Sequence, residues 1–324
     1  MKRKKPWFAI LFGLALFVFT GCLLADTFLI ARPYAVVTSA SAAQEDAQTG
    51  VEAIAVVSAE AAETAQPTAE PSAEPVDAEP VTTETSYSDG NISVALSAYR
   101  LYETTVYVAD VQLTSSDYLL TAFADSTYGR NITEKTSSIA SSVNAILAIN
   151  GDYYGAQRSG YVIRNGVLYR STSSGGEDLV IYRDGSFGII DEDEVTAQAL
   201  LDAGAWNVLS FGPALIEDGA VAVSVNEEVG RAMASNPRTA IGIIDDLHYV
   251  FVVADGRTSE SDGLSLCELA TFLQSLGVQT AYNLDGGGSS TMVFLGNLIN
   301  NPTSGGRRTG ERSVSDIVYI GYGA

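Results

Sequence analysis

The sequence predicts an α+β fold, with a mostly antiparallel or mixed β-sheet core and a few helices. Two observations lead to this class. Apolar and polar residues alternate along short segments such as 105–113, and a period of two is typical of a half-buried strand. Turn pairs recur at Asn165-Gly166, Asp184-Gly185 and Asp218-Gly219, and such pairs supply the positive φ angles of tight hairpins. Later strands are expected at residues 239–244, 249–254, 280–284, 291–295 and 317–320.

Helices are expected at residues 136–145, 195–203 and 264–276. The third is the clearest, because its leucines recur at helical spacing and Gly277 follows as a stop signal. Cys267 lies within it and is expected to be a packed core thiol. The other cysteine of the sequence, Cys22, lies in a different compartment. The two cannot pair, so the domain must be held by its core.

Three regions follow one another along the chain. Residues 1–34 combine a basic start with an uncharged apolar stretch of membrane-spanning length, which predicts one transmembrane helix with a cytoplasmic N-terminus. Residues 35–90 are rich in Ala, Glu, Thr, Ser and Pro and predict a disordered linker. Residues 91–324 are predicted to form the functional domain.

The N-terminal segment has two rival interpretations. A cleaved signal peptide would need a shorter apolar core. A lipoprotein signal would use Thr20-Gly21-Cys22, although Phe19 occupies the position that usually carries Leu. The length of the apolar run favours an uncleaved, single-pass anchor in the cell membrane, with lipidation of Cys22 as the alternative. All three interpretations place the domain outside the cell.

The acidic balance of the chain restricts its partners. The formal net charge is −21, and a nucleic-acid partner is excluded because phosphate backbones need compensating Lys and Arg. Broad electrostatic binding to anionic lipid is disfavoured for the same reason. A substrate that carries phosphate would have to be held locally, by a few arginines and backbone amides.

The composition also excludes most standard catalytic sets. His248 is the only histidine; it lies in an expected strand, no G-x-S-x-G elbow accompanies it, and a solvated strand residue is the simpler interpretation. One histidine and one exported cysteine cannot build a zinc site of the usual type. A site for a hard divalent cation stays open, although the spacing of Asp255 and Asp285 matches no known loop motif.

The most informative segment is residues 281–292. An apolar strand delivers Asp285 to its end, and three glycines and two serines follow. Glycines let the backbone approach a ligand closely, and successive free amides form a concavity that binds anions. The segment lacks the Gly-Lys-Ser/Thr ending of a nucleotide-binding loop. A carboxylate before the glycines and hydroxyls after them favour a functional site over a plain turn.

Two other segments carry suitable chemistry. Arg238 stands at the mouth of an expected strand, and its planar fork suits bidentate binding of phosphate, with a surface ion pair as the alternative. In residues 148–154 a strand runs into a polar and aromatic turn. There Asn150 and Asp152 can bind sugar hydroxyls while Tyr153 or Tyr154 stacks on a ring. That pattern is equally typical of a simple hairpin.

Five motifs in one order resemble the phosphodiester glycosidase family. They are Asn150-Gly151-Asp152-Tyr153-Tyr154, Phe211-Gly212-Pro213, Pro237-Arg238-Thr239-Ala240-Ile241-Gly242, Asp255-Gly256-Arg257 and Asn283-Leu284-Asp285-Gly286-Gly287-Gly288-Ser289-Ser290. The likeness covers about residues 145 to 324, and Arg312-Ser313-Val314-Ser315-Asp316 is similar to a C-terminal family element. Asp152 is a departure, since the family often has a second glycine there, and it bears on turn shape and substrate preference.

The resemblance implies an extracellular hydrolase that cleaves a sugar-1-phosphodiester at the anomeric carbon and releases a free sugar and a phosphomonoester. Surface glycopolymers are the expected substrate. On this hypothesis Asp285 acts as nucleophile or as base for water, and Arg238 is the catalytic cation that holds the phosphate. The expected substrate-binding residues are Asn150, Asp152, Tyr153, Thr239, Asp255, Arg257, Gly286, Gly287, Gly288, Ser289 and Ser290.

Two alternatives and one open question accompany this hypothesis. The same pocket could serve a non-catalytic module that binds glycan or teichoic acid at the cell wall. A phosphoesterase would instead cleave at phosphorus and release a sugar phosphate. No cofactor is required by the expected chemistry, and a divalent cation stays open.

Overall fold

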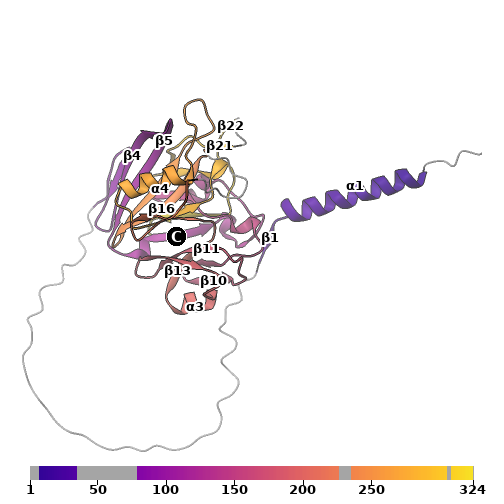
Figure 1. Ribbon diagram of the computed structural model, residues 1–324, viewed down its shortest axis with the longest axis horizontal. Coiled ribbons are helices and arrows are strands. Elements are labelled where there is room, and N and C mark those ends of the chain that lie inside the picture. Colours follow the sequence, from indigo (N-terminus) through magenta and orange to yellow (C-terminus); the bar gives the residue numbers. More distant parts are fainter. Residues whose placement is uncertain (1–6, 35–78, 226–234, 305–307, 324) are drawn as a thin grey trace, which may run out of the picture.

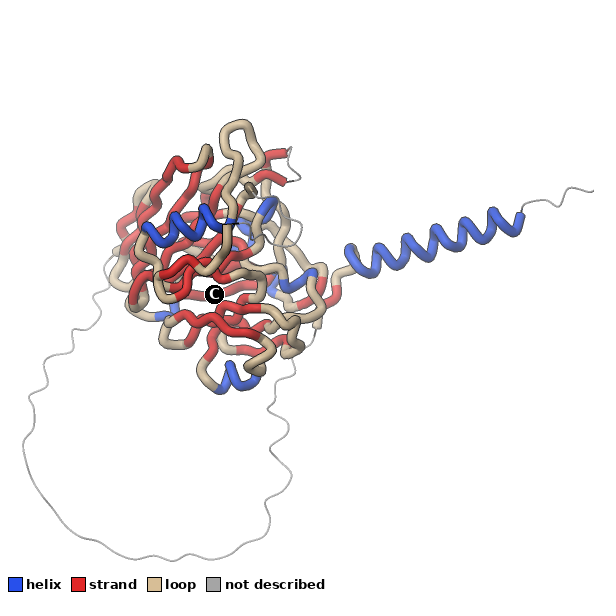
Figure 2. Tube along the Cα trace, viewed as in Figure 1, coloured by secondary structure: helices blue, strands red, loops and turns tan. Residues whose placement is uncertain are grey.

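The structure of the protein is a computed structural model that describes residues 7–34, 79–225, 235–304 and 308–323. Strands form most of the domain, and a few short helices lie on its outside (Figures 1 and 2). The strand pairings that build its three large sheets are antiparallel. The predicted α+β class with a largely antiparallel sheet core is therefore confirmed.

The largest sheet has nine strands, and it carries the chain segments that end at the candidate site. In spatial order these strands are β15 (Ala220–Val221), β14 (Ala214–Glu217), β18 (Thr280–Leu284), β16 (Arg238–Asp245), β17 (His248–Ala254), β5 (Thr104–Leu113), β4 (Ile92–Leu101), β3 (Ser86–Ser88) and β2 (Val81–Thr82).

Two five-stranded sheets and two short strand pairs complete the β structure. One sheet contains β10 (Val167–Arg170), β9 (Val162–Arg164), β13 (Ala205–Leu209), β11 (Glu177–Tyr182) and β12 (Phe187–Asp191). The other contains β20 (Asn297–Leu298), β19 (Met292–Phe294), β8 (Leu147–Asn150), β23 (Asp316–Ile320) and β6 (Leu119–Phe123). The pairs are β1 (Arg32–Pro33) with β7 (Gly129–Arg130) and β21 (Thr303–Ser304) with β22 (Arg308–Thr309).

The α-helices in the described residues are α1 (Trp7–Phe28), α2 (Thr136–Ser142), α3 (Ala197–Asp202) and α4 (Leu266–Ser275). The three helices predicted for the domain are thus confirmed, with slightly shorter bounds. α4 begins at a capping box, in which Ser265 and Glu268 satisfy each other's backbone amides. Cys267 lies in α4, partly buried against the core, as its predicted packing role requires.

The core explains why neighbouring residues along one strand are buried alike. On β17, Phe251 and Val253 face the two five-stranded sheets. Val250 and Val252 face the opposite side, where α4 packs. α2 covers the outer face of the sheet that contains β8, and α3 covers the outer face of the sheet that contains β13. The nine-stranded sheet is therefore buried on both faces along its central strands.

The three predicted hairpin turns are confirmed. Asn165-Gly166 joins β9 to β10, Asp184-Gly185 joins β11 to β12, and Asp218-Gly219 joins β14 to β15. Asn165 and Asp218 adopt φ angles of +50° and +48°. Asparagine and aspartate tolerate this left-handed region better than most residues, which is why the sequence marks these turns.

The folded domain begins before residue 91, the predicted boundary. β2 and β3 lie in the segment that was assigned to the linker, and they extend the edge of the nine-stranded sheet. Tyr87 is buried in the main core, while its neighbours in β3 are serines. The polar composition of β3 gave no strand signal in the sequence, because a strand near the edge of a sheet needs few apolar side chains. Residues 35–78 of the predicted linker lie outside the described residues.

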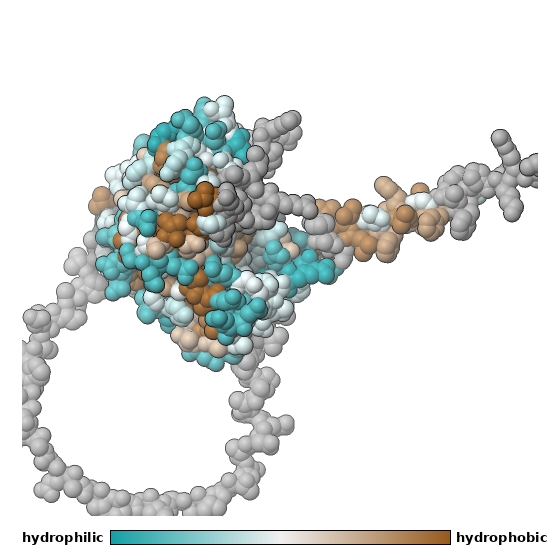
Figure 3. Space-filling model, in the orientation of Figure 1, coloured by the Kyte–Doolittle hydropathy of each residue, from teal (hydrophilic) through white to brown (hydrophobic). Residues whose placement is uncertain are grey.

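α1 projects from the domain, beside the β1–β7 pair (Figure 1). Most of its described side chains are apolar and exposed (Figure 3). No helix in the described parts of the chain reaches the combination of length and apolar character that crossing a membrane would require. The transmembrane role of the N-terminal segment stays a prediction.

Candidate active site

The site lies where the ends of three strands meet. β16 and β18 pair antiparallel, with Thr239 opposite Leu284. The start of β16 and the end of β18 therefore lie side by side, at the same end of these two neighbouring strands. β8 of the neighbouring sheet ends there as well, at Asn150, whose side-chain amide donates to the carbonyl of Asp285 at 2.6 Å. The fold thus brings together three segments that are far apart in the sequence.

Asp285 holds the central carboxylate of the site. Its side chain is only 12% exposed, and Arg312 lies 2.6 Å from Oδ2. Ser289 donates its hydroxyl to the same oxygen at 2.7 Å. Arg312 also donates from Nε to the Ser289 hydroxyl at 2.8 Å. These three side chains form a closed triangle that fixes the carboxylate.

Burial and charge act on the Asp285 carboxyl in opposite directions. Burial raises its pKa above the ordinary value, and the Arg312 guanidinium and the hydrogen bond from Ser289 partly offset this. Desolvation disfavours the charged form, whereas a guanidinium and a donated hydrogen bond favour it. The carboxylate is therefore a stronger base than an exposed aspartate, and its ionisation depends on Arg312.

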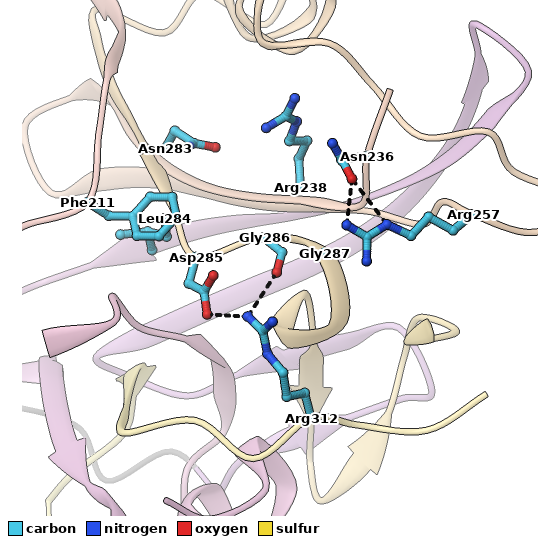
Figure 4. Close-up of a pocket in the computed structure, with 10 residues that line it drawn as sticks. All are labelled: Phe211, Asn236, Arg238, Arg257, Asn283, Leu284, Asp285, Gly286, Gly287 and Arg312. Atoms are coloured by element: carbon cyan, nitrogen blue, oxygen red, sulfur yellow. Dashed lines mark hydrogen bonds and ion pairs between the residues drawn. The ribbon is translucent and has the colours of Figure 1, made fainter. Parts of the chain in front are cut away.

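A pocket of about 180 Å³ opens beside this carboxylate. Three guanidinium groups and one carboxylate share it, and Figure 4 shows how they are arranged. The residues that line it are Phe211, Asn236, Arg238, Arg257, Asn283, Leu284, Asp285, Gly286, Gly287 and Arg312. A small, positively charged pocket with one internal carboxylate suits a ligand that carries phosphate.

The predicted cation Arg238 lines the same pocket as Asp285, as the prediction required. It does not take the position next to the carboxylate. Its Nε donates to the carbonyl of Leu264 at 2.8 Å, and in Figure 4 the side chain extends away from Asp285. Arg257 also lines the pocket and is held by the Asn236 side-chain oxygen, at 2.7 Å from Nη2.

Fewer backbone amides of the glycine segment are free to bind a ligand than predicted. The amide of Gly287 donates to the carbonyl of Pro237 at 2.8 Å. The amides of Ser289 and Ser290 donate to Gly286 and Gly287. The expectation of a cradle of free amides is therefore wrong for these three positions. A 3₁₀ turn uses the amides of Ser289 and Ser290, and the segment before β16 accepts from the amide of Gly287. The pocket takes its positive charge from side chains instead.

Glycine is nevertheless required at position 287. Its φ is +63°, and a Cβ there would lie 3.0 Å from the guanidinium of Arg257. Gly286 also lines the pocket, and Gly288 is buried beside it. The glycines thus let the arginine approach the backbone, and this is the role that the structure supports for them.

Four predicted substrate ligands are buried, and three of them are hydrogen-bonded to protein side chains. Asn150 is fully buried, and its Oδ1 accepts from the Thr239 hydroxyl at 2.9 Å. Thr239 is buried too. Ser289 is engaged with Asp285, and Ser290 is 1% exposed. The expectation that Asn150 and Thr239 contact substrate is corrected: they position Asp285.

Asp152 and Asp255 are also buried against protein partners, although Asp152 lines the pocket that contains Tyr153. Asp152 lies 2.7 Å from Nη2 of Arg164, and the same nitrogen lies 2.8 Å from Asp316. All three side chains are buried. Asp255 accepts from the amide of Asn301 at 2.9 Å and so holds the segment after β20. Sequence alone cannot distinguish a carboxylate that is buried against a protein partner from one that contacts substrate.

Tyr153 fits its predicted role better. It is 40% exposed and lines a second pocket of about 290 Å³, which also contains Asp285 and Arg312. Its ring lies edge-on to Phe211, with ring centroids 6.1 Å apart. An exposed aromatic side chain beside a polar pocket is suited to pack against a sugar ring.

Arg312 was missed as a site residue. The sequence marks it only as part of the similar C-terminal element, and nothing in that segment indicates which side chain it faces. His248, by contrast, lies 3.1 Å from Asp110 at the start of β17 and lines neither pocket. Among the described residues no group of three or more His, Cys, Asp or Glu side chains could hold a metal ion.

The Asp152–Arg164–Asp316 cluster gives a first prediction. Arg164→Leu should lower the free energy of unfolding by about 3–5 kcal/mol, because two buried carboxylates lose the guanidinium that pairs with both. The loss should be larger at pH 8 than at pH 5. Burial and the nearby Asp152 charge already raise the pKa of Asp316 to about 7. In the variant Asp316 is therefore protonated at pH 5, and its burial costs less there than at pH 8.

Urea unfolding at both pH values measures this effect. The matched control is Arg183→Leu, since Arg183 is exposed over the Trp206 ring at 4.4 Å and its loss should cost below about 1 kcal/mol. Equal small losses in both variants would contradict the structural role assigned to Asp152.

Comparison with known proteins places this site in a family. The family model for phosphodiester glycosidases matches residues 143–321. Human N-acetylglucosamine-1-phosphodiester α-N-acetylglucosaminidase is 34% identical over 173 residues, which are 48% of this chain and 33% of that protein. The uncharacterised prophage-derived protein YomE of Bacillus subtilis is 31% identical over 201 residues, 60% of this chain and 31% of that protein. The chain thus spans about a third of the length of these curated relatives.

The fold is similar to that of two solved structures. The catalytic domain of the zebrafish N-acetylglucosamine-1-phosphodiester α-N-acetylglucosaminidase superposes with a TM-score of 0.56 at 21% identity, over 71% of this chain and 82% of that one. A hypothetical protein from Synechocystis superposes with a TM-score of 0.55 at 16% identity, over 71% of this chain and 62% of that one. The matched segment contains Asp285, Arg238, Arg257 and Arg312. The chain belongs to the phosphodiester glycosidase family.

Proposed function

We propose that this protein hydrolyses a sugar-1-phosphodiester at the anomeric carbon and releases a free sugar and a phosphomonoester. One observation carries the proposal: a single buried carboxylate, Asp285, shares a small pocket with the guanidinium groups of Arg238, Arg257 and Arg312. The curated mammalian relatives are named for cleavage of N-acetylglucosamine from a phosphodiester. That named activity supports the same reaction type here.

The charges in the pocket suit this leaving group. Ordinary glycosidases use two carboxyl groups, one of which protonates a poor alkoxide leaving group. A phosphate is already a stable anion when it leaves, so it needs positive donors more than an acid. Three arginines and one carboxylate in the pocket meet that requirement.

Each group then has a defined role. Asp285 attacks the anomeric carbon, or activates the water that does, and it stabilises positive charge on the sugar ring. The guanidinium groups of Arg238, Arg257 and Arg312 hold the phosphate as charge develops on its bridging oxygen. Tyr153 packs against the sugar ring from the adjoining pocket. Asn150 and Thr239 act through the backbone of Asp285, which they keep in place.

We further propose that the domain works outside the cell on surface glycopolymers, anchored by the N-terminal helix. Support for the anchor is the row of exposed apolar side chains along α1, among them Leu11, Phe12, Phe17 and Phe19. Exposed apolar surface of this extent marks an interaction site. Carbonate washing of cell membranes tests the anchor, and release of the full chain into the wash would contradict it.

Asp285→Asn should leave the fold intact and lower kcat by at least about a thousandfold on a sugar-1-phosphodiester, because the side chain keeps its shape but loses its basicity. Release of free sugar is the measurement. Asp110→Asn is the matched control, since Asp110 is half exposed and pairs with His248, and it should retain near-native activity.

The outcomes separate the rival functions. Near-native turnover by Asp285→Asn would remove Asp285 from the mechanism. Release of sugar phosphate in place of free sugar would indicate cleavage at phosphorus. Tight binding of the substrate without any product from the unmodified protein would indicate a glycan-binding module.

Arg312→Gln should move the acidic limb of the kcat/KM profile to higher pH. Arg312 favours the ionised form of Asp285 and opposes the rise in pKa that burial causes, so its removal raises that pKa further. Activity depends on the ionised carboxylate and therefore appears at higher pH in the variant.

The position of the limb, measured from pH 4 to 9, is separate from the height of the profile, so a general loss of rate does not obscure it. Arg183→Gln removes an equal charge outside the pockets and should leave the limb in place. An unchanged limb in Arg312→Gln would mean that another group controls the reaction.

A further inference from the structure

An arginine-lined pocket lies outside the site described so far. Its volume is about 380 Å³, and it is lined by Arg32, Tyr34, Tyr128, Arg130, Gln157, Arg158 and Arg170. None of these seven described residues is acidic. The whole chain has 18 Lys and Arg against 39 Asp and Glu, so four arginines around one pocket are a strong local departure. We call this the arginine pocket.

Arg170, a partly buried arginine of this pocket, is fixed by hydrogen bonds to backbone carbonyls. Arg170 donates from Nη1 to the carbonyls of Tyr154 at 3.0 Å and Gln157 at 3.1 Å. Nε donates to the carbonyl of Gly160 at 2.5 Å. Carbonyl partners orient a guanidinium without cancelling its charge. Burial lowers the pKa of Arg170, and the charges of Asp152 and Glu192 only partly offset this.

The N-terminal segment supplies one wall of the arginine pocket. Arg32 is opposite Arg130 in the β1–β7 pair. The amide of Tyr34 donates to the carbonyl of Tyr128 at 3.0 Å, and the two rings lie 5.7 Å apart. Because this segment follows α1 directly, the pocket is completed only when the N-terminal part of the chain is docked on the domain. Arg158 lies exposed at the rim.

The pocket of Tyr153 shares residues with the candidate active site, and chain neighbours of its residues line the arginine pocket. It contains Asp285 and Arg312 from the active site. It is also lined by Asn131 and Ala156, whose chain neighbours Arg130 and Gln157 line the arginine pocket. Arginines of the active site and of the arginine pocket therefore belong to segments that also border a polar, aromatic pocket suited to a sugar. A chain of sugars joined by phosphates has the matching composition, because its phosphates suit the arginines and its sugars suit the pocket of Tyr153.

We propose that the arginine pocket binds a second phosphate of the same substrate, so that the substrate is a glycophosphate chain with repeated phosphodiesters and not a single sugar phosphodiester. The proposal rests on the proposed function and names the substrate class of that site. Guanidinium groups bind phosphate through two parallel hydrogen bonds. The pocket adds affinity for the chain without touching the bond that breaks.

Two substrates and two double variants test this. The substrates are a single sugar-1-phosphodiester and an oligomer of three sugar-phosphate units. Full-length protein should show a kcat/KM at least about tenfold higher for the oligomer, a gain that matches one charge-assisted phosphate contact. In Arg32→Gln/Arg158→Gln the ratio of the oligomer kcat/KM to the single-phosphodiester kcat/KM should fall to near one, because the KM for the oligomer rises. The matched control, Arg100→Gln/Arg183→Gln, removes the same charge outside the three pockets and should keep the ratio.

A binding measurement distinguishes failure of this proposal from failure of the proposed function. Inorganic tripolyphosphate should bind the full-length protein about tenfold more weakly when Arg32 and Arg158 are replaced, and equally well in the control variant. Equal binding in all three proteins, or an unchanged oligomer ratio, would overturn the second phosphate site. Absence of sugar release from both substrates would overturn the proposed function alone, because the tripolyphosphate result does not depend on turnover.

One further outcome identifies a different ligand. If Arg32→Gln/Arg158→Gln lost binding to phosphatidylglycerol vesicles but kept the oligomer ratio, the pocket would serve a lipid headgroup, and the proposal would be overturned.

Discussion

The buried carboxamide of Asn150 is the constraint on which the active site depends. It donates to the carbonyl of Asp285, and its oxygen accepts from the Thr239 hydroxyl and the amide of Thr291. A buried amide is costly to leave without partners, so it holds all three segments in one arrangement. Because β8 and β18 belong to different sheets, the position of Asp285 is set by how the sheets pack. Any movement between the sheets would shift the carboxylate, and a rigid frame of this kind preorganises a site.

Local charge in this protein opposes its overall charge. A chain of net charge −21 repels phosphate in general, yet the pocket beside Asp285 is lined by three arginines. Arg238 and Arg257 are anchored by oxygens of Leu264 and Asn236. Arg312 pairs closely with the Asp285 carboxylate. Fixed arginines in the pocket can attract a phosphate there, while the net negative charge of the chain repels phosphate from the rest of the surface.

Much of this fold could be predicted from local signals, while the partners of buried polar groups could not. Hairpin turns, the cap of α4 and a carboxylate at the end of β18 each have a signature within a few residues. The role of Arg312 depends on a contact with a residue 27 positions earlier, and no local pattern specifies it. Asn150 and Asp152 have the composition of sugar ligands, and only the packing of the sheets shows that both are buried. The first strands of the domain were missed because serines surround Tyr87.

The central claim is that the bond broken is the one between the anomeric carbon and oxygen, with the phosphate leaving intact. Hydrolysis of a sugar-1-phosphodiester in ¹⁸O-labelled water, followed by mass spectrometry of both products, tests it directly. The geometry around Asp285 predicts that the label enters the free sugar and that the phosphomonoester carries none. Label in the phosphomonoester would place the attack at phosphorus and contradict the account.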